Sequence, residues 1–296
     1  MPGPRLPDGV GLTALVTAYA RAQESRRPRP LFTDPLAELF VAAAVGAEDI
    51  AAHELPRLGP ARQDGSSDLW NSLYGYFSGR TPFYDRYLST SVAAGARQVV
   101  LLGAGLDARA YRLSLPDDAT VFEIDSAAVL DFKAVVVGRH ELRSAARVVA
   151  VAADLREDWA RALTDRGFEP DKPTAWMAEG LLMYLTSGQA DRLLGEIDSL
   201  SASSSTLAGE YLNRRTALTD VAVSDAADRA VAELFVSADQ GGPAAEPVTW
   251  LANQGWVGAA RDFVTELAAL DRATPGLFDD TRPDPLRLSL FTATKP

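Results

Sequence analysis

The sequence predicts a doubly wound, Rossmann-like α/β fold, in which helices cover both faces of a parallel sheet. From residue 97 onward, short and nearly continuous apolar runs follow one another. Such runs are typical of strands buried on both faces of a parallel sheet. Helical patterns separate several runs, as expected for βαβ units. The first run ends in a glycine-rich loop, "GAGLDA" at residues 103–108, which is typical of the first turn in such a sheet.

Five apolar runs predict the parallel strands: residues 97–102, 119–125, 147–155, 174–180 and 205–212. The first run ends in Gly103, and each of the others carries an acid at or near its end: Asp125, Asp154, Glu179 and Glu210. A sixth strand is predicted at residues 285–292, where leucines alternate with polar residues. This period of two favours an antiparallel or edge strand.

Helical patterns dominate residues 1–96, which we expect to form an N-terminal cap on a core of residues 97–296, within one structural domain. One helix is predicted to begin at Asp34–Pro35, an N-cap followed by proline. Another is predicted to begin at Thr81–Pro82 and to end near residue 95. In the core, Thr186 and Gln189 fit a capping box for a helix over residues 186–200.

The composition argues against several classes of protein. The net charge of −11 over 296 residues opposes nucleic-acid binding, because phosphates would be repelled. The chain has no cysteine and only two histidines, so we expect neither thiol chemistry nor a bound metal. No apolar run reaches the roughly 20 residues that span a bilayer, and no signal-peptide pattern is present. We therefore expect a cytoplasmic protein without a membrane partner.

The glycine loop indicates a nucleotide-like ligand. Gly103, Gly105 and Ala108 match the pattern G-x-G-x-x-G/A, and Asp125 follows at the spacing of about 20 residues expected for a ribose-binding acid. The fingerprint alone allows NAD, FAD or S-adenosyl-L-methionine, because all three carry an adenosine. Glu179 lies within an apolar run. A buried carboxylate is costly without a partner, so Glu179 is expected to have a cationic or hydrogen-bonding one.

Five motifs occur in order: "GRTPFYDRYL", "VVLLGAGLDARAYRL", "VFEID", "AADLREDW" and "PTAWMAEGLLMYL". Together they resemble the leucine carboxyl methyltransferase-like family of S-adenosylmethionine-dependent enzymes, whose bacterial members are often O-methyltransferases. The resemblance runs from about residue 12 to the C-terminus and is strongest over residues 79–186. It implies a class I methyltransferase sheet of about seven strands, the last of them antiparallel.

The resemblance also implies a set of contacts to S-adenosyl-L-methionine. These are Arg80 to the methionine carboxylate, Gly103 and Gly105 beneath the methionine portion, Asp125 to the ribose hydroxyls, Asp154 and the Leu155 backbone to the adenine amino group, and Glu179 to the ammonium. Arg21 is a second candidate for the carboxylate. A dinucleotide would instead bring a pyrophosphate, for which an acid at Glu179 is a poor neighbour.

The acceptor is predicted to be a carboxylate of a small molecule, such as a secondary metabolite. A carboxylate is already an anion at neutral pH, whereas a hydroxyl usually needs a general base, often histidine. No catalytic residue is therefore assigned. The candidate substrate residues are Tyr184, Tyr211 and Arg214, with Arg109, Arg112 and Arg215 as further cations. Residues 211–247 are expected to form a lid insertion, and their apolar residues suit an apolar substrate.

Several alternatives stay open at this point. The acceptor could be a hydroxyl group or the C-terminal carboxylate of a protein. An NAD(P)-dependent oxidoreductase and a non-catalytic cofactor-binding protein rank below these, because the long helical stretch before the first strand and the Glu179 motif favour a methyltransferase. The sequence does not predict an oligomeric state.

Overall fold

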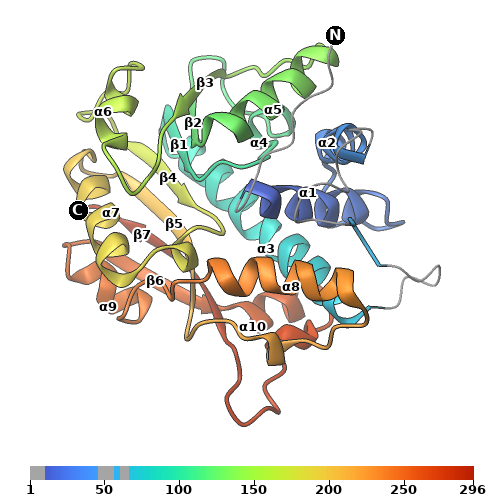
Figure 1. The fold of residues 1–296 in the computed structure, drawn as a ribbon. Helices are drawn as coiled ribbons and strands as arrows, with labels where there is room; N and C mark the ends of the chain where they lie inside the picture. The colour runs from blue at the N-terminus through green and yellow to red at the C-terminus, as the bar shows by residue number, and fades with distance from the viewer. Residues whose placement is uncertain (1–10, 46–56, 61–66) are drawn as a thin grey trace.

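The computed structural model describes residues 11–45, 57–60 and 67–296, which form one sheet with helices along both faces (Figure 1). The strands are β1 (Gln98–Leu102), β2 (Thr120–Asp125), β3 (Arg147–Ala152), β4 (Thr174–Ala178), β5 (Thr206–Leu212), β6 (Val257–Asp262) and β7 (Leu288–Thr294). The α-helices are α1 (Gly11–Ser25), α2 (Pro35–Val45), α3 (Asp68–Ala93), α4 (Arg109–Arg112), α5 (Ala127–Arg139), α6 (Trp159–Thr164), α7 (Ser187–Ser199), α8 (Ala226–Ala238), α9 (Pro247–Ala252) and α10 (Phe263–Ala269). Short 3₁₀ turns are η2 (Leu182–Tyr184), η3 (Leu218–Asp220) and η4 (Gly276–Phe278).

The strand order in the sheet is β3-β2-β1-β4-β5-β7-β6. Strands β1 to β5 pair in parallel, and β7 runs antiparallel to both β5 and β6. The order reverses between β1 and β4, and in such sheets ligands bind beside this switch point. The predicted doubly wound fold of about seven strands with an antiparallel last strand is therefore confirmed.

One strand of the sheet, β6, was not predicted from the sequence. Strand β7 is antiparallel, as predicted, and lies inside the sheet because β6 pairs along its other side. Strand β6 has the sequence "VGAARD" and is mostly exposed. It was not predicted because an exposed edge strand carries no apolar run.

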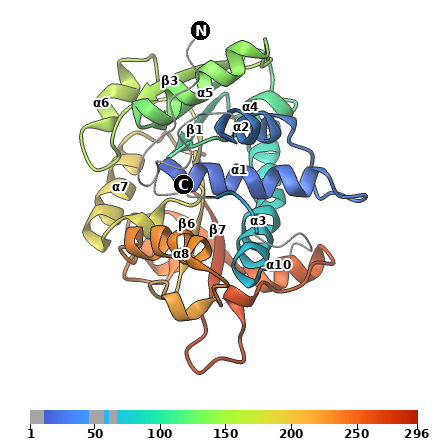
Figure 2. The ribbon, with the colours of Figure 1, turned by 45° about the vertical axis from the view of Figure 1, so that its right-hand side comes forward.

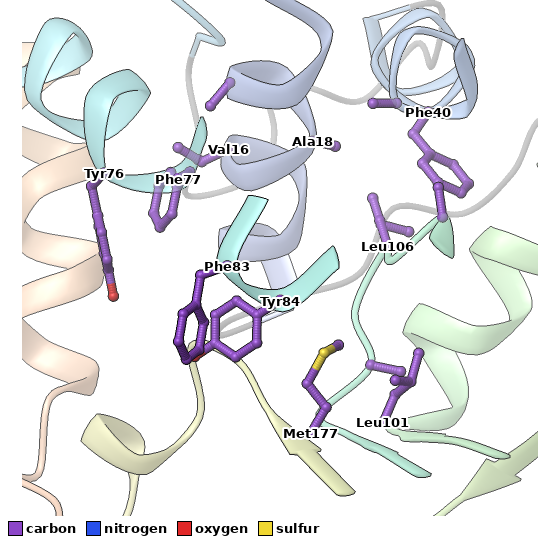
Figure 3. Packing of buried hydrophobic residues seen from close by; sticks show 14 of the residues in the cluster. Val16, Ala18, Phe40, Tyr76, Phe77, Phe83, Tyr84, Leu101, Leu106 and Met177 are labelled. Atoms are coloured by element: carbon purple, nitrogen blue, oxygen red, sulfur yellow. The ribbon is translucent and has the colours of Figure 1, made fainter. Parts of the chain in front are cut away.

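Side chains on the two faces of the sheet belong to separate hydrophobic clusters. Val99 and Leu101 of β1 join the cluster of α1, α2, α3 and α5, whereas Val100 and Leu102 join the cluster of α6, α7 and α9. Figure 3 shows part of the first cluster, where α1 and α3 meet β1 and β4. Helix α1 also lies against α2 and α3 (Figure 2). The N-terminal helices are thus placed over the sheet at the switch point.

The helix predicted to begin at Thr81–Pro82 begins much earlier, so that prediction is wrong. Helix α3 is capped by Ser67, whose side chain accepts the N–H of Trp70, and Pro82 lies inside it. Proline inside a helix removes one backbone hydrogen bond. Most of this long helix is buried, and such packing overrides the local signal of one proline. As a result, Arg80 lies within the helix.

Two other predicted helix starts are confirmed. Asp34 caps α2, since its Oδ1 accepts the N–H of Ala37 at 2.9 Å. Thr186 and Gln189 form the predicted capping box at the start of α7. In both cases the signal is local, because the cap and its acceptor lie within one turn.

Candidate functional site

A cavity of about 1060 Å³ lies at the carboxyl ends of β1, β2, β3 and β4. Its floor consists of the residues that follow these strands: 103–107, 125–127, 152–156 and 179–181. Helices α1, α3 and α8 supply its walls. Pockets for ligands usually measure about 300–1,000 Å³. The cavity therefore has room for a nucleoside cofactor together with a second small molecule.

The glycine loop follows β1 and forms part of the floor. Gly103 and Gly105 have φ angles of 64° and 50°, a left-handed conformation that favours glycine. A Cβ on Gly105 would lie 3.3 Å from the Cβ of Ala14, so the loop lies close against α1. The N–H of Gly105 donates to Oδ2 of Asp125 at 2.7 Å. Both predicted glycines thus border the cavity, as expected for a loop that a ligand approaches closely.

Asp125 ends β2 and borders the cavity. Its second oxygen, Oδ1, accepts the N–H of Ser126 at 2.7 Å. Burial raises the pKa of Asp125, and these two backbone N–H groups oppose the rise. The carboxylate is held at the floor by the backbone of both neighbouring loops.

Arg80, Glu179 and Glu210 form a buried ion-pair cluster. Nε of Arg80 donates to Glu179 Oε1 at 3.0 Å, and Nη1 donates to Glu210 Oε1 at 2.6 Å. The other oxygen of Glu179 lies 2.7 Å from Nη1 of Arg109. The side chains of Arg80 and Glu210 are 4% and 0% exposed, and that of Glu179 is 12% exposed. The cationic partner expected for Glu179 is thus present.

Aromatic side chains of α3 hold this cluster in place. The guanidinium of Arg80 lies 4.6 Å from the ring centre of Tyr76 and 4.9 Å from that of Phe77. The hydroxyls of Tyr76 and Tyr84 donate to Glu210. Burial raises the pKa of Glu210, opposed by Arg80. Burial alone would lower the pKa of Arg80, but the nearby acids and tyrosines raise it overall, so Arg80 stays charged.

Asp154 and Leu155 border the cavity on the loop after β3. Arg156 donates to Asp154 through Nη2 at 2.6 Å. This hydrogen bond lowers the pKa of Asp154. The two residues predicted for the adenine thus lie at the same edge of the sheet as Asp125.

Arg21 of α1 also borders the cavity, but two of its three guanidinium nitrogens are engaged within the protein. Nε donates to Asp34 Oδ2 at 2.9 Å, and Nη2 donates to the carbonyl of Leu106 at 2.6 Å. Arg21 therefore ties α1 to the glycine loop.

The structure separates the three predicted substrate residues. Tyr184 borders the cavity, but Tyr211 and Arg214 do not. Glu210 points toward α3, and consecutive residues of a strand point to opposite faces, so Tyr211 points away. Arg214 pairs instead with the acids Asp220 and Asp284, at 2.7 and 3.2 Å.

The other predicted cations also lie outside the cavity lining. Arg109 and Arg112 both bind Asp85 of α3, with shortest distances of 2.7 and 2.6 Å. Arg215 does not border the cavity either. Arg109 and Arg112 follow a strand in the sequence, but their side chains form ion pairs within the protein. Among the described residues, the arginines of the lining are Arg21 and Arg80 of the N-terminal helices, and Arg156.

Several cavity residues were not singled out from the sequence. They are Thr13 and Thr17 of α1, Tyr76 and Phe77 of α3, Met183 of η2, and Gln240 after α8. Tyr76, Phe77 and Arg80 lie within about one helical turn, so a correct start for α3 would have placed them on one face. No comparable sequence pattern marks Thr13 and Thr17 of α1 as cavity residues.

Asp107, at the end of the glycine loop, is expected to make the stability of the fold depend on pH. Burial alone would raise its pKa, but Arg109 lowers it overall to about 2. A lowered pKa stabilises the fold above pH 4, and this contribution of about 2 kcal/mol is lost as the pH falls through 2. Asp107→Asn should therefore lower the unfolding free energy at pH 7 by about that amount, and by less at about pH 3.

Urea unfolding at both pH values measures this difference. Asp118→Asn is the matched control, because Asp118 pairs with Arg97 at the exposed surface. A difference that stays constant between the two pH values would contradict the assignment.

The order of the sheet and the large cavity at its switch point are those of a class I S-adenosyl-L-methionine-dependent methyltransferase. A crystal structure described as a methyltransferase from Thermobifida fusca has a similar fold, with a TM-score of 0.53 and 18% identity over 96% of this chain and 94% of that one. A DUF574 family protein from Streptomyces avermitilis gives a TM-score of 0.52 at 13% identity, covering 96% and 97%.

The model of the leucine carboxyl methyltransferase family matches residues 14–198, and the chain belongs to this family. A protein of Mycolicibacterium paratuberculosis is 39% identical over 97% of this chain and 95% of its own length. One of Parafrankia sp. is 41% identical over 90% and 83%. Both carry names that describe S-adenosyl-L-methionine-dependent methyltransferases. The chain is accordingly a methyltransferase enzyme that uses this cofactor, as the sequence predicted.

The described parts of the chain contain neither a membrane-spanning helix nor a cluster of metal ligands. Over residues 11–45, 57–60 and 67–296, no helix is long and apolar enough to cross a membrane. Across the same ranges, no group of three or more histidine, aspartate or glutamate residues is placed to hold a metal ion.

Proposed function

We propose that the protein transfers the methyl group of S-adenosyl-L-methionine to a carboxylate oxygen of a small molecule. The observation that carries the acceptor assignment is that the described residues lining the cavity include no histidine and no unengaged acid. Its four acids, Asp107, Asp125, Asp154 and Glu179, are each already held by an arginine or by backbone N–H groups. Burial raises the pKa of Tyr184 to about 12 and that of Tyr76 well above 10, so neither is ionised at pH 7. An acceptor that arrives as an anion needs no base.

The charged cluster fits the amino-acid end of the cofactor. This end is a zwitterion, with a carboxylate and an ammonium. We propose that Arg80 takes the carboxylate and Glu179 takes the ammonium, so that the Arg80–Glu179 pair opens and both partners exchange for ligand groups. Arg80 exchanges one carboxylate for another, and Glu179 exchanges a guanidinium for an ammonium. The exchange therefore leaves no buried charge unpaired. Arg109, which lies 2.7 Å from the other oxygen of Glu179, is proposed to stay paired with it.

The loops after β1, β2 and β3 fit the other end of the cofactor. Asp125 is proposed to accept the ribose hydroxyls, and Asp154 with the Leu155 backbone is proposed to hold the adenine amino group. Gly103 and Gly105 leave the backbone open beneath the methionine portion. For Asp154 to act, one of its oxygens must turn from Arg156 to the ligand.

When bound, the cofactor supplies a methyl carbon on its sulfonium, to which the acceptor oxygen bonds while the C–S electron pair returns to sulfur. The protein aligns the two reactants and excludes water. Helices α1 and α3 cover one side of the cavity, and Phe235 and Gln240 of the 211–247 insertion cover another. We propose that residues 1–96 and this insertion act as cap and lid over the core.

Calorimetric titration with S-adenosylhomocysteine, S-adenosylmethionine and NADH tests the cofactor site. Micromolar binding of the first two, without binding of NADH, is expected. Radiolabelled methyl transfer to a panel of carboxylic acids and of hydroxylated compounds without a carboxyl group then tests the acceptor. A methyl ester releases volatile methanol in mild alkali, whereas a methyl ether does not. Alkali-stable label on hydroxylated compounds alone would overturn the carboxylate assignment and leave the cofactor assignment intact.

A further inference from the structure

Asp85 of α3 holds two arginines just outside the cavity. Its Oδ1 accepts Nε of Arg109 at 2.7 Å and Nη2 of Arg112 at 2.6 Å. Its Oδ2 accepts Nη1 of Arg112 at 2.7 Å. The side chain of Asp85 is 16% exposed, and those of both arginines are buried. Asp85 does not line the cavity, so any influence that it has on a ligand there must pass through a neighbouring side chain.

Arg109 connects Asp85 to Glu179, which does line the cavity. Its Nε donates to Asp85, and its Nη1 lies 2.7 Å from Oε2 of Glu179. Nη1 also donates to Asp107. Burial alone would lower the pKa of Arg109, but these three acids raise it overall. Arg109 therefore stays charged, and its single charge is shared among three carboxylates.

Helix α3 also orients Arg109. Arg109 begins α4 directly after the glycine loop, and its guanidinium lies 5.7 Å from the ring centre of Tyr84. Its remaining nitrogen, Nη2, is buried and has no hydrogen-bond partner among the described residues. The direction in which Arg109 points thus depends on α3 on one side and on Asp107 and Glu179 on the other.

The proposed binding of the cofactor makes the sharing of this charge important. In the structure, Glu179 pairs with both Arg80 and Arg109. When the ammonium of the cofactor replaces Arg80, it must share the carboxylate of Glu179 with Arg109. Charges within a few ångströms interact strongly in a buried site. A carboxylate that Arg109 neutralised completely would therefore attract the ammonium only weakly.

We propose that Asp85 is a positioning residue for the cofactor. By holding Nε of Arg109, it offsets part of the charge of that arginine and leaves more of the charge of Glu179 for the ammonium. This inference rests on the proposed function, in which Glu179 takes the ammonium. Asp85 thus increases the affinity for ligands that carry the amino group and does not act on the adenosine end.

Calorimetry on the full chain compares three ligands that share the adenosine and the sulfur. S-adenosylhomocysteine carries the ammonium and the carboxylate, 5′-S-(3-carboxypropyl)-5′-thioadenosine carries only the carboxylate, and 5′-methylthioadenosine carries neither. The wild type should bind the first at least about tenfold more tightly than the second. Asp85→Asn keeps the shape of the side chain but removes its charge. It should weaken S-adenosylhomocysteine by about tenfold and leave the other two ligands unweakened.

Arg112→Met separates the two arginines that Asp85 holds. It leaves Arg109 paired with Asp85, so all three affinities should match the wild type. The double variant Asp85→Asn/Arg112→Met should show the selective loss of Asp85→Asn. It replaces that variant if the single substitution fails to fold, because it also removes an arginine that has lost its acid. Asp220→Asn is the matched control, since Asp220 is a buried acid that binds two nitrogens of Arg214, and neither residue lines the cavity.

The outcomes distinguish this inference from the proposed function. Equal losses for all three ligands, or no loss for S-adenosylhomocysteine in the variants that lack Asp85, would overturn the role of Asp85 alone. A selective loss in Arg112→Met would overturn it as well, because the effect would then not pass through Arg109. If the wild type bound S-adenosylhomocysteine and the carboxypropyl compound equally, Glu179 would not hold the ammonium, and the proposed contact would fail together with this inference.

Discussion

Replacing Arg80 with methionine should weaken the binding of S-adenosylhomocysteine by at least about 30-fold. Truncating one partner of a buried charge pair typically costs about 2–5 kcal/mol in binding. The same variant should bind 5′-methylthioadenosine as the wild type does, because this ligand has the adenosine and the sulfur but no amino-acid end. The difference between the two ligands isolates the proposed contact from a general loss of structure.

Arg80→Met should also destabilise the fold. Glu210 is fully buried and would keep only the hydroxyls of Tyr76 and Tyr84 as partners. Losing one partner of a buried ion pair costs about 3–5 kcal/mol. The double variant Arg80→Met/Glu210→Gln should recover part of this stability, since it removes the unpaired charge, but it should not recover S-adenosylhomocysteine binding.

Arg272→Met is the matched control for these measurements. Arg272 pairs with Glu24, another fully buried glutamate, but neither residue lines the described cavity. This control should lose stability with unchanged affinity for both ligands. Equal losses of affinity for the two ligands in Arg80→Met would contradict the assignment of Arg80 to the amino-acid end.

Asp125→Asn should weaken S-adenosylhomocysteine and 5′-methylthioadenosine to the same extent, by roughly 10- to 100-fold. Both ligands carry the ribose, and hydrogen bonds to a charged group are worth about 1.5–3 kcal/mol. The amide would also place a donor near the N–H groups of Gly105 and Ser126, which now donate to the carboxylate. Calorimetry with both ligands, at one temperature and pH, measures the effect.

Asp131→Asn is the control for this second prediction, because Asp131 is exposed on the neighbouring helix α5. It should leave both affinities unchanged. If Asp125→Asn weakened only S-adenosylhomocysteine, the carboxylate would belong to the amino-acid end of the ligand, and the proposed orientation of the cofactor would be reversed.

Local patterns were sufficient for much of the fold. The strands that lead to Gly103, Asp125 and Glu179 are nearly continuous apolar runs, and the caps at Asp34 and Thr186 act within one helical turn. Strand β6 and the start of α3 were missed for the opposite reason. The exposed edge strand has no apolar run, and Pro82 gives a local signal that the packing of α3 overrides.

The sequence by itself determined the family, the cofactor class and the sheet edge at which the site lies. It could do so because parallel strands bring their carboxyl ends to one edge, so motifs after successive strands converge without further information. Only the tertiary structure decided which charges meet. Glu210 and Arg80 are 130 residues apart in the chain, yet they form a hydrogen-bonded ion pair.

The tertiary structure also decided which side chains line the cavity. Tyr211 lies in the fifth strand and Arg214 follows it, but the alternation of the strand and the acids Asp220 and Asp284 direct them away from the cavity. The neighbouring rings of Phe77 and Phe235, which line the cavity, come from α3 and α8, two helices that are distant in sequence. Contacts of this kind depend on how helices pack, and such packing is set by the shapes of many side chains at once, which no short motif encodes.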